Sequence, residues 1–241
     1  MNQDEALVRA VRLCKRFGGI TAVDAFDFSV RQGELVALIG PNGSGKTTLV
    51  NMLTGHLNPE SGEIFLRGRR VNGLPSFEFA ALGVGRTFQM SQPFRRLSVL
   101  ENMLVPGLTR PRSTREATAA CARVHLKFLG LAHLETLAAR NLSGGQQKLL
   151  ELGRALMLEP LIVFLDEPFA GVHPTLRSEI IERILELNAS GRTFVVVDHD
   201  MEAIQRLAGR LVVMARGRLI ADGPPDRVRE DQAVLAAYAG V

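Results

Sequence analysis

The 241-residue chain has only two cysteines, Cys14 and Cys121, which lie far apart and belong to no C-x-x-C pair. This scarcity argues against a disulfide framework and against the usual zinc motifs, and it predicts two buried thiols. The longest apolar runs, such as LIVFL at residues 161–165, fall far short of the roughly 20 residues of a membrane-spanning helix. The N-terminal segment also lacks the apolar core of a signal peptide. We therefore expect a cytoplasmic protein.

Composition is that of an ordinary globular protein, with 46% hydrophobic residues, enough for one large domain or two small subdomains. The 29 basic and 25 acidic residues give a net charge of +4. Such a charge suits nucleic acid, an anionic membrane surface or a bound nucleotide, and alone it does not choose among them.

Strand and helix patterns alternate along most of the chain. Residues 6–13 and 25–30 alternate apolar and polar side chains, as half-buried antiparallel strands do. ELVALIG predicts a buried strand before a glycine loop and a helix that ends at Gly55, and a helix over residues 174–189 separates the runs LIVFLD and TFVVVDH. This order favours a mostly parallel sheet, with ligands bound beyond the carboxyl ends of its strands.

Helical patterns replace strands between Gln89 and Leu142, where SVLENMLV and TREATAACARVHLKFLGL occur. We interpret residues 91–158, approximately, as a helical subdomain within a single domain that spans residues 1–241. No internal repeat is found, so the chain holds one nucleotide-binding module.

A glycine loop matches the phosphate-binding pattern G-x-x-x-x-G-K-[ST]. In this pattern backbone N–H groups surround phosphates, the lysine reaches the terminal phosphates, and the hydroxyl of Thr47 binds magnesium. The nucleotide-binding residues predicted here are Gly40, Pro41, Asn42, Gly43, Ser44, Gly45, Lys46, Thr47 and Thr48.

Two further motifs carry chemistry. LIVFLDEP delivers Asp166 and Glu167 at the end of a buried strand, where a phosphate-bound magnesium needs a carboxylate and an attacking water needs a base. Strand alternation predicts that the two side chains point in different directions. NLSGGQQ places Ser143, Gly144 and Gly145 before a helix, which predicts a second anion-binding helix N-terminus, because an N-cap alone requires only the serine.

The order of these motifs, with Gln89 after VGRTF and His199 after FVVVD, resembles that of the ATP-binding subunits of ABC transporters over essentially the whole chain. The resemblance implies an α/β fold with a P-loop NTPase (RecA-like) core, a mostly parallel sheet, an N-terminal antiparallel β part and an inserted helical subdomain. It also implies ATP and Mg²⁺ as ligands, and a head-to-tail dimer in which each ATP lies between the P-loop of one chain and the signature of the other.

By position, the resemblance assigns a role to each motif residue. Glu167 corresponds to the general base, His199 to the switch histidine, and Gln89 to a catalytic glutamine that also belongs to the magnesium shell with Thr47 and Asp166. Phe17 stands where the family stacks an aromatic ring on adenine. The signature extends from Leu142 through Ser143, Gly144 and Gly145 to Gln146.

Within the family, FGGITAVDAFDF, GVGRTFQ and FRRLSVLENMLV look most like the Liv-type importer subunits for branched-chain amino acids. DEPFAGV also resembles the lipopolysaccharide-export ATPase, so a lipid exporter and a non-transport ABC ATPase remain alternatives. His173 departs from the family, in which many members have Asp there and Liv-type members often have Asn, and this puts the usual hydrogen bond across the dimer in doubt.

The implied partners are a second ATP-binding subunit, identical or different, and permease subunits at the inner face of the cell membrane, with no nucleic acid. We expect the permease to dock near residues 89–96, where Phe94 lies beside Arg95 and Arg96. The segment between Gln89 and the signature is too short for the coiled-coil arms of a DNA-repair ATPase, and a GTPase would need an N-K-x-D loop that is missing. The sequence leaves the transported substrate and the direction of transport open.

Overall fold

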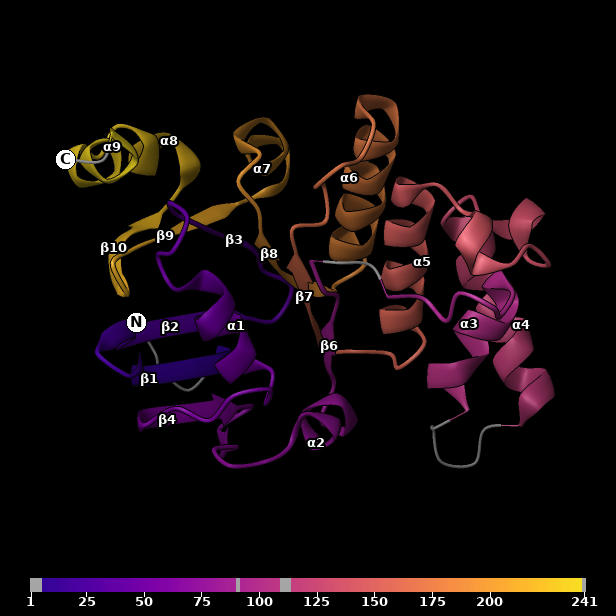
Figure 1. The fold of residues 1–241 in the computed structure, drawn as a ribbon, viewed down its shortest axis with the longest axis horizontal. Helices are drawn as coiled ribbons and strands as arrows, with labels where there is room; N and C mark the ends of the chain where they lie inside the picture. The colour runs from indigo at the N-terminus through magenta and orange to yellow at the C-terminus, as the bar shows by residue number, and fades with distance from the viewer. Residues whose placement is uncertain (1–5, 90–91, 109–113, 240–241) are drawn as a thin grey trace.

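The computed structural model describes residues 6–89, 92–108 and 114–239, and it contains two β-sheets with helices around them. The strands of the N-terminal sheet lie beside helix α1, and helices α3, α4 and α5 lie together at the far end of the molecule from them (Figure 1). No helix of the described residues is long and apolar enough to cross a bilayer.

The smaller sheet is antiparallel and has the strand order β2-β1-β4-β5. Its two long strands confirm the predicted antiparallel start of the chain, although each is longer than predicted because pairing continues through the polar residues that flank the apolar ones. Its strands are β1 (Ala6–Phe17), β2 (Ile20–Arg31), β4 (Ser61–Leu66) and β5 (Arg69–Arg70).

The larger sheet has the order β10-β9-β3-β8-β7-β6 and is parallel except for the edge pair of β9 and β10. Its central strands are buried along their whole length and are apolar except for Asp166 at the end of β7 and Thr193 at the start of β8, as is typical of strands covered on both faces. Its strands are β3 (Leu35–Ile39), β6 (Val84–Arg86), β7 (Ile162–Asp166), β8 (Thr193–Val197), β9 (Arg210–Ala215) and β10 (Arg218–Gly223).

Helices follow most of the strands of the larger sheet. The predicted helix over residues 174–189 is confirmed with the same bounds. The helices are α1 (Lys46–Leu53), α2 (Ser76–Ala81), α3 (Val99–Gly107), α4 (Arg115–Phe128), α5 (Gly144–Leu156), α6 (Pro174–Ala189), α7 (Met201–Leu207), α8 (Pro225–Arg229) and α9 (Gln232–Ala239), with 3-10 turns η2 (Ala132–Leu134) and η3 (Ala139–Asn141).

The core consists of two apolar clusters, one on each face of the larger sheet. Alternate residues of β3 separate between them: Leu35 and Ile39 belong to the cluster beneath α3–α7, whereas Val36 and Leu38 belong to the cluster shared with α1 and the smaller sheet. The strand period of two therefore distributes one sequence run over both faces. This arrangement leaves the carboxyl ends of the strands free to carry loops.

The region predicted as helical does contain α3, α4 and α5, and its described residues form no strand apart from an isolated bridge between Ser98 and Ala138. The bounds 91–158 of a subdomain stay a prediction, and Ser91 lies outside the described residues.

The two cysteines are less buried than the sequence analysis predicts. Cys14 and Cys121 are free and only partly buried. Cys14 lies at an irregularity of the β1–β2 pairing, where its Sγ accepts from Ala25 N at 3.2 Å.

A fully buried asparagine organises the segment that leads into α3. Asn102 accepts from Phe94 N at 2.8 Å through Oδ1. Its Nδ2 lies 2.9–3.3 Å from the carbonyl oxygens of Phe94, Leu97 and Ser98. One side chain therefore holds the backbone of a whole turn and fixes the base of Phe94.

We predict that Asn102→Ala destabilises the protein by about 1–3 kcal/mol, because it leaves a buried N–H and several carbonyl groups without their partner. Urea denaturation followed by circular dichroism measures the change. The exposed Asn58 provides a matched control, for which Asn58→Ala is expected to cost less than about 0.5 kcal/mol. Equal stabilities of the two variants would contradict this account of Asn102.

Candidate active site

The glycine loop between β3 and α1 has room for backbone alone at two of its positions. Gly40 and Gly45 have φ angles of +149° and +108°. A Cβ atom on Gly40 would lie 2.0 Å from Met214 O, and one on Gly45 would lie 2.1 Å from Ala22 O. Neighbouring strands therefore press against the back of the loop, and only glycine fits at these two positions.

Lys46 begins helix α1 and folds back over the loop that precedes it. Its Nζ donates to Gly40 O at 2.8 Å, to Pro41 O at 2.9 Å and to Ser44 Oγ at 3.3 Å. Burial lowers the pKa of Lys46, and the charges of Glu167 and Asp166 oppose that shift. The three acceptors are neutral, so a bound polyphosphate offers the ammonium group a stronger, charge-assisted bond in the same place.

Asp166 and Glu167 stand at the end of β7 in different environments, as the sequence predicts. Asp166 is 4% exposed, and its Oδ2 accepts from the guanidinium of Arg86 at 3.2 Å. Burial raises the pKa of Asp166, and Arg86 opposes the rise. Glu167 is partly exposed and has a φ angle of +47°, so a left-handed turn at the strand end adds to simple alternation in separating the two carboxylates.

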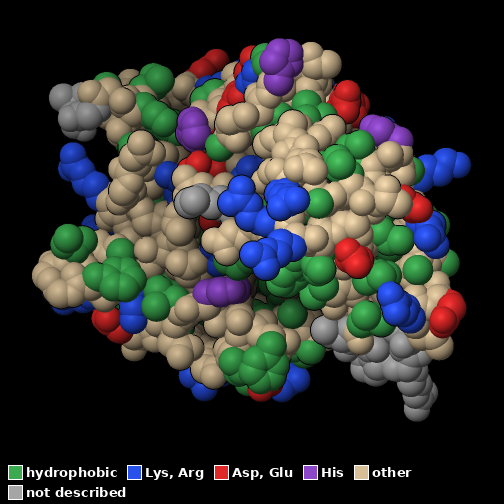
Figure 2. Space-filling view, turned by 45° about the vertical axis from the view of Figure 1, so that its right-hand side comes forward, with side chains coloured by type: hydrophobic (Ala, Val, Ile, Leu, Met, Phe, Trp, Pro, Cys, Tyr) green, Lys and Arg blue, Asp and Glu red, His purple; other side chains and the backbone are tan. Residues whose placement is uncertain are grey.

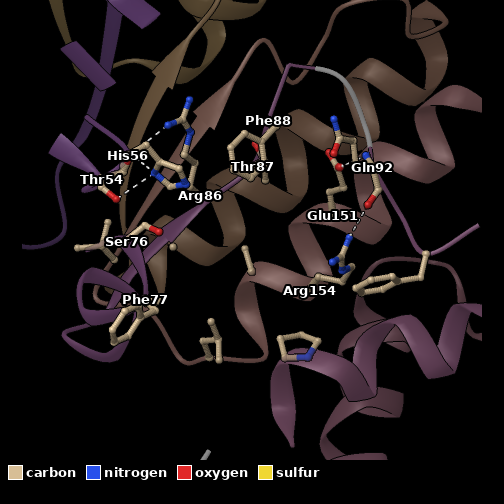
Figure 3. A pocket seen from close by; sticks show the side chains of 17 residues that line it. Thr54, His56, Ser76, Phe77, Arg86, Thr87, Phe88, Gln92, Glu151 and Arg154 are labelled. Atoms are coloured by element: carbon tan, nitrogen blue, oxygen red, sulfur yellow. Dashed lines mark hydrogen bonds between the residues drawn. The ribbon is translucent and has the colours of Figure 1, made fainter. Parts of the chain in front are cut away.

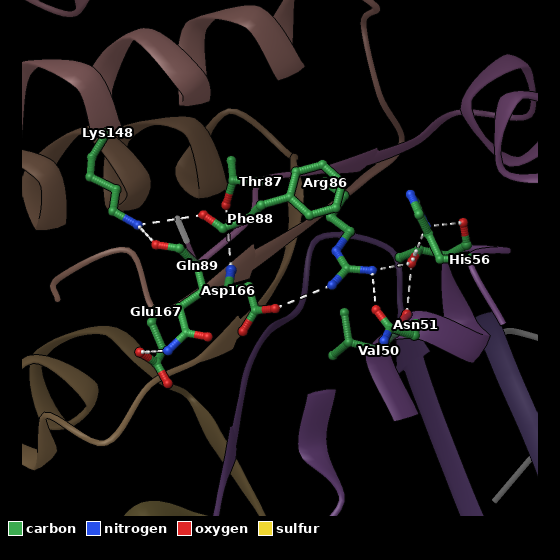
Figure 4. Close-up of polar contacts among 11 residues, drawn as sticks. Val50, Asn51, His56, Arg86, Thr87, Phe88, Gln89, Lys148, Asp166 and Glu167 are labelled. Carbon is green, nitrogen blue, oxygen red and sulfur yellow. Dashed lines mark hydrogen bonds and ion pairs between the residues drawn. The ribbon is translucent and has the colours of Figure 1, made fainter. Parts of the chain in front are cut away.

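Gln89 reaches the site from the loop after β6. Its Nε2 donates to Glu167 Oε2 at 2.8 Å (Figure 4). Lys148, from helix α5, donates to the backbone oxygen of Gln89 at 2.6 Å. Burial lowers the pKa of Lys148, and the nearby carboxylates, Glu151 first, oppose the shift. The structure therefore brings together Gln89, Asp166 and Glu167 as expected, and it adds Arg86 and Lys148, which the motif analysis missed.

The loop after β8 brings His199 to the same edge of the sheet. Its side chain is 67% exposed, whereas that of the preceding Asp198 is 1% exposed. Asp198 accepts from the backbone N–H groups of Phe169, His199 and Asp200 at 2.7–3.2 Å. Burial raises the pKa of Asp198, and these hydrogen bonds oppose the rise. The buried aspartate thus shapes the loop that presents the histidine.

The signature residues lie at the start of α5. Ser143 caps the helix, with its Oγ accepting from Gln146 N at 3.3 Å, and Gln146 Oε1 accepts from Ser143 N at 2.9 Å. A Cβ atom on Gly145 would lie 2.1 Å from Leu176 of α6, whereas Gly144 is open. Close packing of α5 on α6 is thus a second reason for glycine at Gly145, and the anion-binding role of this helix N-terminus stays a prediction. In Figure 1, α5 lies well away from α1, so the signature does not complete the glycine loop of its own chain.

Two further residues singled out in the sequence lie on the surface. Phe17 is 50% exposed at the end of β1, with the ammonium of Lys15 5.7 Å from its ring centroid. His173 is exposed and caps α6, where its Nδ1 accepts from Thr175 N at 3.4 Å. The imidazole therefore makes a hydrogen bond within its own chain.

The site offers a few oxygen ligands for a divalent cation, and a bound phosphate would add to them. The described residues contain no group of three or more His, Cys, Asp and Glu side chains that would hold a metal by itself. Thr47 is exposed on the first turn of α1, and Asp166 and Gln89 lie at neighbouring strand ends. Mg²⁺ binds in this way, through one or two carboxylates, substrate phosphates and water.

Comparisons with known proteins agree with this geometry. A family profile described as ABC transporter matches residues 23–170, and one described as branched-chain amino acid ATP-binding cassette transporter matches residues 218–238. The chain is 38% identical over 243 residues to the high-affinity branched-chain amino acid transport ATP-binding protein LivG of Escherichia coli (strain K12), covering 95% of each chain.

Solved structures are similar over nearly the whole chain. The ADP conformation of MJ1267, an ATP-binding cassette of an ABC transporter, superposes with a TM-score of 0.87 at 35% identity and covers 98% of this chain and 99% of that one. A dimeric post-hydrolysis state of the cassette MJ0796, bound to ADP and phosphate, has a TM-score of 0.82 at 27% identity and covers 90% of this chain and 98% of that one.

We predict that Lys46→Ala weakens ATP binding by about 10- to 100-fold, because the charge-assisted bonds of the ammonium to phosphate are lost. Isothermal titration calorimetry measures the affinity. Lys127→Ala, which removes an exposed lysine of α4, is the control and is expected to bind ATP as the unmodified protein does. An unchanged affinity of the Lys46 variant would contradict the assignment of the phosphate loop.

Proposed function

The chain belongs to the ABC transporter family as an ATP-hydrolysing subunit, and we propose that it powers the import of branched-chain amino acids. Two observations support this substrate class over lipid export. The C-terminal residues 218–238 match the profile described as branched-chain amino acid ATP-binding cassette transporter, and the relative LivG carries the same substrate in its name.

The observation that carries the catalytic proposal is the hydrogen bond of Gln89 to Glu167 beside the phosphate loop. We assign Glu167 as the base that takes a proton from the attacking water, because its carboxylate is partly exposed and held at a strand end. Lys46 and the loop N–H groups bind the phosphates, and His199 lies on the same edge. Thr47, Asp166 and Gln89 would hold a magnesium ion, which would supply positive charge beside the phosphates.

We further propose that two cassettes form each complete site. The α5 N-terminus, with Ser143 at its cap, presents the backbone N–H groups of its first turn and the positive end of a helix dipole. Such a surface attracts the terminal phosphate of an ATP bound to another chain. The ADP- and phosphate-bound dimer of the related cassette MJ0796 supports this arrangement. The partner cassette is a second copy of this chain or a related subunit.

The surface proposed for the permease is a groove of about 540 Å³, lined from α2, β6, α3 and α5 (Figure 3). Phe77 and Phe94 are 72% and 45% exposed at its rim. Lys and Arg side chains gather near the middle of the face shown in Figure 2, with hydrophobic side chains below them. A permease segment with apolar side chains suits the exposed aromatic rings of this groove, and such docking would hold the protein at the inner face of the membrane.

We predict that Glu167→Gln lowers ATP turnover by about 100-fold or more while ATP still binds and the ATP-bound dimer accumulates, because the amide keeps the shape but accepts no proton. Turnover, sedimentation velocity with ATP, and uptake of radiolabelled leucine by cells that depend on this chain measure these effects.

Glu179→Gln, which changes an exposed glutamate of α6, is the matched control and is expected to retain turnover and leucine uptake. Retained turnover in the Glu167 variant would contradict its role as the base. Loss of turnover with unchanged leucine uptake would contradict the substrate class instead.

For the docking groove, we predict that Phe94→Asp prevents copurification with the permease, because it places a carboxylate in an apolar contact. Val124→Asp, at an exposed apolar residue of α4 outside the groove, is expected to leave the complex intact. Thermal denaturation verifies that both variants are folded. Copurification of both variants in equal yield would exclude Phe94 from the interface.

A further inference from the structure

Arg86, the last residue of β6, lies between the groove and the nucleotide site. Its side chain is 7% exposed. One terminal nitrogen donates to Asp166 Oδ2 at 3.2 Å, and the other donates to Asn51 Oδ1 at 2.6 Å and to Thr54 Oγ1 at 3.0 Å (Figure 4). The guanidinium therefore joins the end of α1, which follows the phosphate loop, to the carboxylate at the end of β7.

The same guanidinium forms part of the groove wall. Its central carbon lies 4.8 Å from the ring centroid of Phe88, which is 42% exposed, and the imidazole of His56 meets that ring edge-on at 5.5 Å. Figure 3 shows His56, Arg86 and Phe88 together on one side of the groove. Arg86 Nε is buried and has no hydrogen-bond acceptor among the described residues. The ring of Phe88 therefore packs against a guanidinium whose two terminal nitrogens are hydrogen-bonded and whose Nε is not.

A planar guanidinium fixes the orientation of a carboxylate more strictly than a point charge does. Because Arg86 engages Oδ2, Asp166 is held with Oδ1 left for a magnesium shell. Residues that orient a metal-binding carboxylate in this way usually change metal affinity by 10- to 100-fold when they are removed. If a segment bound in the groove moved Phe88, the displacement would be transmitted to Asp166 through the side chain of Arg86.

We propose that Arg86 is a positioning residue that orients the Asp166 carboxylate for magnesium and couples that orientation to the groove wall through Phe88. The inference rests on the proposed role of Asp166 in the magnesium shell. It adds a route by which a partner in the groove alters magnesium binding without touching the nucleotide.

The test measures the Mg²⁺ concentration that half-saturates the fluorescence change of bound mant-ATP, a nucleotide with a fluorescent ribose group. Arg86→Met is expected to raise this midpoint by about 10- to 100-fold, with mant-ATP affinity in EDTA changed by less than about twofold. Arg86→Lys keeps the positive charge but loses the planar guanidinium with its two terminal nitrogens. Its midpoint is expected to lie between those of Arg86→Met and the unmodified protein.

Arg210→Met is the matched control, because Arg210 is also a largely buried arginine at a strand end of the same sheet and pairs with Glu34 and Asp222. Its midpoint is expected to equal that of the unmodified protein. Unchanged midpoints in both Arg86 variants would overturn the proposal, and so would an equal rise in Arg210→Met. If Arg86→Met does not fold, Arg86→Lys and the Phe88 variant described below decide.

A separate variant tests the coupling between Arg86 and the groove. Phe88→Ala removes the ring but keeps Arg86, and it is expected to raise the Mg²⁺ midpoint by about threefold. Val124→Ala, at an exposed apolar residue outside the groove, is expected to leave it unchanged. A midpoint in Phe88→Ala equal to that of the unmodified protein would overturn the coupling. If the fluorescence of mant-ATP bound to the unmodified protein does not change with Mg²⁺ concentration, the proposed function itself is contradicted.

Discussion

The parallel pairing of β3, β8, β7 and β6 is the constraint on which the site depends. Parallel strands end at the same edge of a sheet, so the segments that follow four neighbouring strands meet there. Those segments carry Lys46, His199, Glu167 and Gln89, which lie far apart in the sequence. The pairing of the backbone strands therefore brings these residues to one edge of the sheet.

The balance of buried charges at this edge of the sheet favours the binding of a polyphosphate. Burial works against both kinds of charge, since it lowers the pKa of Lys46 and Lys148 and raises that of Asp166. The acids oppose the shifts of the lysines, and Arg86 opposes the shift of Asp166. The hydrogen bonds of Lys46 go to neutral oxygen atoms of its own loop, so a phosphate that enters the loop offers this cation a charged partner.

The placement of the signature and of Lys148 on helix α5 is consistent with the proposed dimer. The signature at the start of α5 lies away from the phosphate loop of its own chain, whereas Lys148 of the same helix bonds to the loop of Gln89. Helix α5 thus has one end available to another chain and its middle connected to the site of its own chain. Arg86 gives the groove a comparable connection through Asp166, so both proposed partner surfaces lead to the same pair of carboxylates.

The sequence by itself determined the motifs, the order of strands and helices, and the family, because glycine loops, apolar strands and acidic strand ends are local signals. Gly40 to Lys46 and the Asp166–Glu167 pair could be proposed as site residues for this reason, and the structure places them at the ends of β3 and β7. Only the tertiary structure decided that Arg86 and Lys148 belong to the site, that Gly145 is small because Leu176 packs against it, and that His173 caps its own helix. Each of these depends on a contact between segments or on a side-chain rotamer, and neither leaves a periodic pattern in the sequence.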